Sequence, residues 1–124
     1  MAYNYKHLFI LGSLFSLLVL MFDRVGNYFN LYYFYPNFDI PMHFLGGFAV
    51  GFLALALLSK IKKIKLFYQI IIVLFIGIIW EVLEYYFKVS VLYGGNFYTD
   101  TALDLIIDTL GGILSYICFY RKIK

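Results

Sequence analysis

The chain has 124 residues, of which 64% are hydrophobic, 23% are aromatic and only 14% are charged. One small soluble core cannot bury that much apolar surface, so the composition excludes a soluble globular domain and indicates an integral membrane protein. The net charge is +3, but most of the basic residues lie in short segments beside the apolar runs, where membrane topology and anionic headgroups explain them. We therefore expect no nucleic-acid binding.

Four apolar runs follow one another along the chain, at residues 8–22, 42–58, 66–87 and 102–120. Their lengths are near the roughly 20 residues that cross a bilayer. The first run resembles the core of a signal peptide, but no small-x-small cleavage site follows it, so we interpret it as a retained span. The runs predict an all-α membrane protein, a bundle of four transmembrane helices that forms a single domain over residues 1–124.

The basic residues predict the topology. Eight of the ten lie at three places that four spans would put on one side of the membrane: Lys6, then Lys60, Lys62, Lys63 and Lys65, then Arg121, Lys122 and Lys124. The positive-inside rule makes that side cytoplasmic, so we expect an inner-membrane protein with both termini in the cytoplasm. The aromatic segment 27–36 then lies at the outer surface, and its pattern does not decide between a short helix and a loop.

All acidic residues lie on the opposite side: Asp23, Asp39, Glu81, Glu84, Asp100, Asp104 and Asp108. Carboxylates in or beside a span are unfavourable and are kept mainly for function. Glu81 and Asp108 lie deepest, about 9 Å inside the ends of their predicted helices at 1.5 Å per residue. These two residues are therefore the strongest candidates for a functional site.

Helical spacing extends the candidate site to three helices. Asp104 and Asp108 are four residues apart and Glu81 and Glu84 are three apart, so each pair shares a helix face. If Asp39 caps the second helix, His43 lies about one turn in from the same side of the membrane. The predicted catalytic residues are His43, Glu81 and Asp108, and the predicted metal ligands are His43, Glu81, Glu84, Asp104 and Asp108.

Small residues accompany the polar ones on two of these helices. They follow His43 at positions 47, 51 and 54, and they follow Asp108 at positions 111, 112 and 115. Small residues at such spacings allow helices to approach closely in lipid, so the acidic layer should face the bundle interior. Its charge then requires bound protons or a counter-charge from His43, Arg24 or a cation.

Each polar residue also has a structural interpretation. Asp39 and Asp100 fit helix N-caps, and Thr101-x-x-Asp104 fits a capping box. His43 and Trp80 are common at membrane interfaces. The remaining alternatives are two local ion pairs, Asp23 with Arg24 and Glu84 with Lys88.

A weak internal repeat relates the two halves of the chain. Residues 39–47 and 104–112 share four of nine positions. The repeat favours two helical hairpins in the same orientation, related by an axis along the membrane normal. Because Leu-Gly-Gly is common in membrane spans, coincidence is the alternative.

Carboxylates with an imidazole suit a divalent ion such as Mg²⁺, Mn²⁺ or Zn²⁺, although the spacing matches no standard metal motif. The first functional hypothesis is a cation-assisted enzyme or binder that acts on an envelope lipid or lipid-linked substrate, with Glu81 as general base. The alternatives are a small proton- or cation-coupled transporter and an accessory subunit that contacts another membrane protein. Whether the protein is an enzyme stays open, as does its oligomeric state.

Three segments carry a resemblance to known proteins: Asp39-x-x-x-His43-Phe-Leu-Gly-Gly-Phe, Trp80-Glu81-x-x-Glu84-Tyr, and Asp100-Thr101-x-x-Asp104-x-x-x-Asp108-x-x-Gly-Gly. They resemble small bacterial inner-membrane proteins of the YjdF type and, more loosely, VanZ-like proteins. The resemblance implies a multi-span protein with a polar intramembrane site. VanZ-like proteins are associated with altered sensitivity to glycopeptide antibiotics, which points toward the cell envelope but identifies no reaction.

Overall fold

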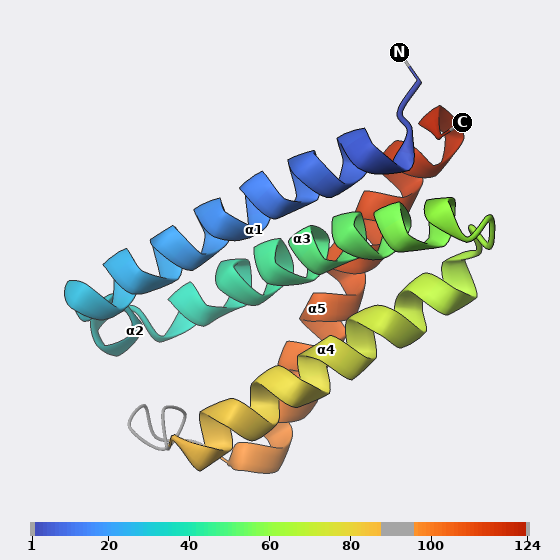
Figure 1. The fold of residues 1–124 in the computed structure, drawn as a ribbon. Helices are drawn as coiled ribbons and strands as arrows, with labels where there is room; N and C mark the ends of the chain where they lie inside the picture. Colours follow the sequence, from blue (N-terminus) through green and yellow to red (C-terminus); the bar gives the residue numbers. More distant parts are fainter. Residues whose placement is uncertain (1, 88–95, 124) are drawn as a thin grey trace.

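The computed structural model describes residues 2–87 and 96–123. Four long helices dominate it (Figure 1): α1 (Tyr5–Tyr28), α3 (Asp39–Lys60), α4 (Leu66–Tyr86) and α5 (Phe97–Phe119). Each is long and apolar enough to cross a membrane. The described part of the chain contains no strand, only an isolated bridge between Tyr3 and Ile123. The predicted all-α fold with four spans is confirmed.

Helices α1 and α5 begin before their predicted apolar runs, because a polar residue caps each of them further out. The Asn4 side chain accepts a hydrogen bond of 3.0 Å from the backbone N–H of His7 at the start of α1. Asn96 accepts one of 2.9 Å from the backbone N–H of Tyr98 at the start of α5. Such caps satisfy backbone donors that a helix start leaves free. Hydropathy alone therefore underestimates the length of both helices.

The aromatic segment between α1 and α3 forms two short helical turns, α2 (Leu31–Phe34) and the 3-10 turn η1 (Pro36–Phe38). The ring of Tyr32 packs edge-on against the ring of Phe38, with 5.0 Å between the ring centroids. The Tyr32 hydroxyl donates a 2.6 Å hydrogen bond to Asp23. Burial and this bond beside the Asp23 carboxylate raise the pKa of Tyr32 well above its usual range. Tyr32 therefore stays a proton donor that joins this segment to α1.

Helices α3 and α5 cross at glycines. A Cβ atom added at Gly47 would lie 2.0 Å from the Asp108 carbonyl oxygen, and one at Gly111 would lie 2.2 Å from the Phe44 carbonyl oxygen. The predicted close approach of the small-residue stripes is thus confirmed. The crossing puts His43, one turn before Gly47, beside Asp108.

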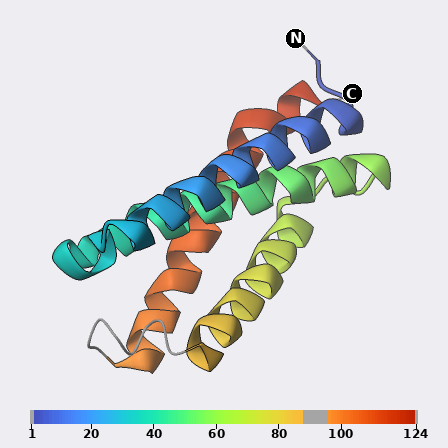
Figure 2. The same cartoon turned by 60° about the vertical axis from the view of Figure 1, so that its left-hand side comes forward.

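The outer helices flank this central pair. Helix α1 packs along α3, and α4 packs on both α3 and α5, as Figures 1 and 2 show from two directions. Two parallel-related hairpins would give this arrangement, although the duplication itself stays a prediction. An apolar cluster of Leu8, Phe52, Leu55 and Ala56 fills the end of the bundle near the termini.

The charges separate between the two ends of the bundle. The N- and C-termini lie together at one end, near the α3–α4 turn (Figure 1), and the backbone N–H of Tyr3 donates to the Lys122 carbonyl at 2.6 Å. A final 3-10 turn, η3 (Tyr120–Lys122), carries basic residues at this end. The α1–α3 connection and the start of α5, with the acidic residues, lie at the other end.

Candidate functional site

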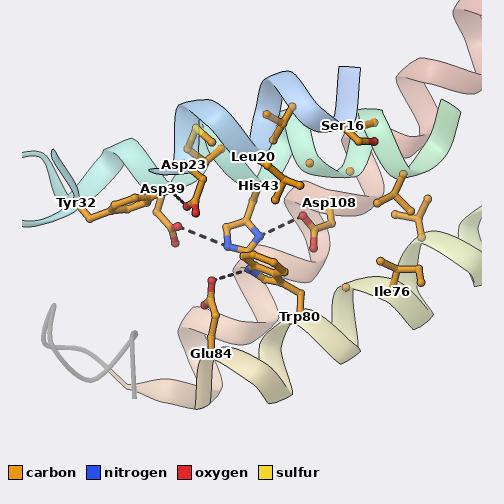
Figure 3. Close-up of a pocket in the computed structure, with 18 residues that line it drawn as sticks. Ser16, Leu20, Asp23, Tyr32, Asp39, His43, Ile76, Trp80, Glu84 and Asp108 are labelled. Carbon is orange, nitrogen blue, oxygen red and sulfur yellow. Dashed lines mark hydrogen bonds and ion pairs between the residues drawn. The ribbon is translucent and has the colours of Figure 1, made fainter. Parts of the chain in front are cut away.

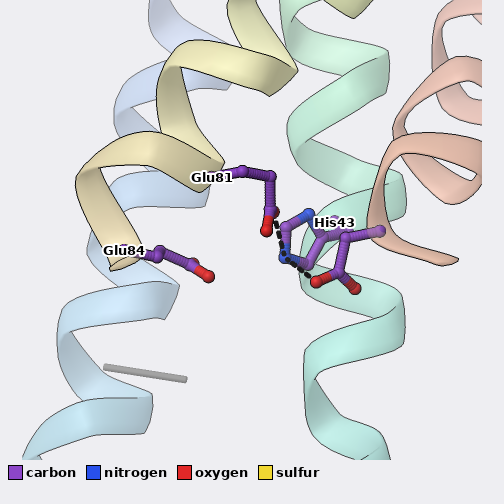
Figure 4. Close-up of side chains that lie close together, drawn as sticks. His43, Glu81 and Glu84 are labelled. Atoms are coloured by element: carbon purple, nitrogen blue, oxygen red, sulfur yellow. Dashed lines mark ion pairs between the residues drawn. The ribbon is translucent and has the colours of Figure 1, made fainter. Parts of the chain in front are cut away.

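His43 on α3 is the centre of the acidic layer. Its Nδ1 atom is 3.1 Å from Asp108 Oδ1 on α5. Its Nε2 atom is 3.6 Å from Asp104 Oδ2 and 3.9 Å from Glu81 Oε1 on α4, as Figure 4 shows for Glu81. Asp39 Oδ1, one turn earlier on α3, is 3.5 Å from the same nitrogen. One imidazole thus faces four carboxylates from three helices.

The centre of the cluster is buried. His43, Glu81, Asp104 and Asp108 are 6%, 3%, 2% and 7% exposed, respectively. The glycines make this possible: a Cβ atom at Gly77 would lie 2.9 Å from Asp108 Oδ2. The structure therefore brings the predicted site residues of three helices together, while their roles stay predictions.

Two carboxylate oxygens in the cluster lack hydrogen bonds. Glu81 Oε1 and Asp104 Oδ2 are buried and have no hydrogen-bond partner within residues 2–87 and 96–123. The other oxygen of Glu81 accepts a 3.0 Å bond from the Thr101 hydroxyl on α5. Leaving a buried charged group unsatisfied is unfavourable by at least about 1–3 kcal/mol. The two oxygens therefore require a proton or a cation.

Glu84 completes a group with the geometry of a metal site. The indole N–H of Trp80 donates to Glu84 Oε1 at 2.6 Å. His43, Glu81, Glu84 and Asp104 each offer one ligand atom, and these four atoms lie within 4.8 Å of one another. Two ligand atoms on opposite sides of an ion, each at a bond length of about 2.0–2.6 Å, are separated by a similar distance. Asp108, on the opposite nitrogen of His43, is outside this group.

Asp39, Asp100 and Asp104 form a second group with the same spacing. Asp39 and Asp100 are only partly buried, unlike Asp104. Asp104 is thus common to both groups.

The structure corrects several structural interpretations. Asp39 is the first residue of α3 and not its N-cap, and the described residues provide no side-chain cap there. Helix α5 begins at Phe97, before Asp100, because Asn96 is its cap. Thr101 and Asp104 therefore lie inside the helix and form no capping box.

The two expected ion pairs have different outcomes. Arg24 pairs with the adjacent Asp23 at the surface and is not a counter-charge for the cluster. The expected partner of Glu84, Lys88, lies outside the described residues. Among the expected counter-charges on the chain, only His43 lies in the cluster.

Sequence reasoning missed Gln69 on α4. Its side chain is fully buried, and its amide N–H donates to the Gly112 carbonyl at 2.7 Å and to the Ser115 hydroxyl at 2.9 Å. Its Oε1 atom has no partner in the described part of the chain. The signal was a lone amide in an otherwise apolar and aromatic run, and it points to a polar contact between α4 and α5.

A cavity of about 210 Å³ lies next to the cluster (Figure 3). Its walls come from α1 and α4, with α3 between them. His43, Glu84 and Asp108 line it, whereas Glu81 and Asp104 do not. The cluster therefore has one side open to the cavity and one side enclosed by helices.

Fold and site together define a multi-pass helical membrane protein with a buried carboxylate–histidine cluster. The chain belongs to a family described as predicted membrane protein (DUF2238), whose sequence model matches residues 3–124. This membership is consistent with the resemblance to proteins of the YjdF type and does not show the looser one to VanZ-like proteins. Searches of curated proteins and of solved structures found no match.

Proposed function

We propose that the protein binds a divalent cation through His43, Glu81, Glu84 and Asp104, and uses it to bind or modify an envelope lipid or lipid-linked substrate. One observation carries the proposal: Glu81 Oε1 and Asp104 Oδ2 are buried without a hydrogen-bond donor among the residues that the structure describes, and both lie within 4 Å of His43 Nε2. A cation among these atoms would satisfy both oxygens at once.

The orientation of His43 supports the same proposal. When His43 donates its Nδ1–H to Asp108 Oδ1 at 3.1 Å, its Nε2 lone pair points toward Glu81 and Asp104. A histidine that ligates a metal commonly donates its other ring N–H to a carboxylate in this way. Asp108 is then the residue that orients His43, and Mg²⁺, Mn²⁺ and Zn²⁺ are the candidate ions.

A bound divalent cation would polarise a substrate oxygen or activate water. The chain's own contribution would be to position the ligands and to accept a proton. Glu81 is our candidate for the general base, because its Oε1 atom would ligate the cation while Oε2, which accepts the Thr101 hydrogen bond, keeps a lone pair that can accept a proton. Substrate would approach through the cavity, which His43 and Glu84 line.

The proposed location is the inner membrane, with both termini in the cytoplasm and the site facing outward. Lys60, Lys62, Lys63 and Lys65 lie at or beside the α3–α4 turn, at the end that holds both termini (Figure 1). The positive-inside rule assigns that end to the cytoplasm. The substrate is then in or beside the outer leaflet, and the resemblance to VanZ-like proteins supports an envelope substrate.

A second candidate, a proton- or cation-coupled transporter, has one supporting observation. Gln69 and Ser115 form a buried polar pair two turns beyond Asp108 on the same side of α5. Such a pair can stabilise an ion or water between the cluster and the other end of the bundle. Liposomes containing the protein should then take up protons or cations in a Glu81-dependent manner, and silent liposomes would contradict transport.

The cation site is tested by thermal unfolding of detergent-purified protein, first with a chelator and then with Mg²⁺, Mn²⁺ or Zn²⁺. A cation that binds only the folded state, present at a concentration 100 times its Kd, raises the free energy of unfolding by about 2.7 kcal/mol. We expect one of these ions to raise the Tm of the wild type but not of the Glu81→Gln, Asp104→Asn double variant. The control Asp23→Asn, outside the ligand group, should keep the response. An unchanged response in the double variant would reject the site.

Thr101 is expected to position Glu81 for the cation. Thr101→Val removes the 3.0 Å hydrogen bond while keeping the side-chain volume. Loss of a residue that orients a ligand typically lowers metal affinity about 10- to 100-fold. Titration calorimetry should show that loss for Thr101→Val. Thr109→Val is the matched control, because the Thr109 hydroxyl donates to the Leu105 carbonyl of its own helix. Equal affinities of the two variants would refute the role of Thr101.

A further inference from the structure

The cavity beside the cluster is a groove that opens between two membrane spans. Val19 and Leu20 on α1 form one wall, and Ile76 and Trp80 on α4 form the other (Figure 3). Leu20, Ile76 and Trp80 are 47%, 40% and 38% exposed. Because these residues belong to membrane-spanning helices, the surface they expose faces lipid. The groove can therefore be entered from within the bilayer.

The groove changes character along its length. Val19, Val50, Val73 and Ile76 make one part apolar, deeper in the bundle, while Asp39, His43 and Glu84 line the part at the acidic end. Tyr32 and Trp80 place aromatic rings at that same end. This is the polarity profile of a lipid, with an apolar chain on one side and a polar headgroup on the other.

The charge of the polar end selects the headgroup. Four carboxylates line the groove, from Asp23, Asp39, Glu84 and Asp108, and His43 is the only basic residue among the described lining residues. Arg24 pairs with Asp23 but does not line the groove. Carboxylates beside aromatic rings favour an ammonium group, by ion pairing and by cation–π attraction.

We propose that this groove binds one acyl chain of a phospholipid with a primary-amine headgroup, whose ammonium lies against Asp39. The inference rests on the proposed function, since it names the substrate class of the same site. A cation held by His43, Glu81, Glu84 and Asp104 would offset carboxylates that otherwise repel the lipid phosphate.

Native mass spectrometry tests the proposal on the delipidated full chain, titrated with phosphatidylethanolamine or phosphatidylglycerol in detergent. We expect one phosphatidylethanolamine bound about tenfold more tightly than phosphatidylglycerol, as one charge-assisted bond implies. Val50→Phe fills the apolar part of the groove and should weaken binding at least about tenfold. Val82→Phe is the matched control, because Val82 is 59% exposed on α4 and does not line the groove.

Headgroup selection is tested separately. Asp39→Asn, which leaves the proposed cation ligands intact, should bring the two lipids to equal affinity. Equal affinity already in the wild type would overturn the headgroup assignment, and equal binding by Val50→Phe and Val82→Phe would overturn the groove. If Val50→Phe does not fold, Val19→Phe fills the groove from the α1 wall and decides the same question.

Lipid and cation binding are measured on the same samples. Wild-type protein that responds to a divalent cation but retains no lipid would overturn this inference alone. Protein that retains phosphatidylethanolamine but responds to no cation would overturn the cation site alone. Protein that binds neither would overturn both.

Discussion

Gly47→Ala is expected to destabilise the protein strongly, whereas Gly46→Ala, one residue earlier, is not. The new methyl group at position 47 would lie 2.0 Å from the carbonyl oxygen of Asp108 and 2.6 Å from its Cα atom. These are backbone atoms of α5, so the two helices must separate. Overpacking of this kind is unfavourable by about 1–3 kcal/mol or more. The separation would also move Asp108 away from His43.

Gly46→Ala is the matched control. No described atom lies within 4 Å of a Cβ atom added at Gly46, and alanine is favoured over glycine in a helix by up to about 1 kcal/mol. Thermal unfolding in detergent should give a clearly lower Tm for Gly47→Ala and an unchanged or higher Tm for Gly46→Ala. Equal Tm values would show that α3 and α5 do not cross at Gly47.

His43→Ala is expected to have the largest effect on the site. Without the imidazole, Asp108 loses its 3.1 Å partner, and Asp39, Glu81 and Asp104 lose the basic side chain that faces them. Removing one partner of a buried ion pair is unfavourable by about 3–5 kcal/mol. Loss of a residue that only orients a ligand lowers metal affinity about 10- to 100-fold. Loss of the ligand His43 itself should therefore lower cation affinity by more than about 100-fold.

The control for His43→Ala is His7→Ala, at the other histidine of the chain. His7 is exposed on α1, and its backbone bond to Asn4 survives the substitution. Unfolding with chelator and calorimetry with Mn²⁺ should both separate the two variants. Similar stability and similar affinity would mean that His43 is only an interfacial histidine.

Hydropathy and charge were sufficient to predict the four spans and to place the acidic residues at one end. Depth within the spans singled out Glu81 and Asp108, because a residue more than a turn inside a span has few structural roles. Helical spacing added His43 at the same level, and the roles of all three residues stay predictions. The small residues at positions 47 and 111 also predicted which helix faces meet. These features depend on local sequence, which a single chain displays directly.

Other features depend on contacts between helices and were not predictable. Thr101 fits a cap by local pattern, but α5 begins about one turn earlier, at Phe97 with Asn96 as its cap. The Thr101 hydroxyl is therefore free to bond Glu81 on another helix. The contact of Gln69 with Gly112 and Ser115 requires the register of α4 against α5. The groove requires the separation of α1 from α4, which neither helix encodes alone.

The central claim is that a divalent cation binds between His43, Glu81, Glu84 and Asp104. Anomalous diffraction from crystals grown with Mn²⁺ tests it most directly, because the signal locates the ion itself. We predict one strong peak within bonding distance of His43 Nε2 and of carboxylate oxygens of Glu81 and Asp104, and no such peak in the Glu81→Gln, Asp104→Asn variant. A wild-type crystal soaked at saturating Mn²⁺ without density between these side chains would contradict the account.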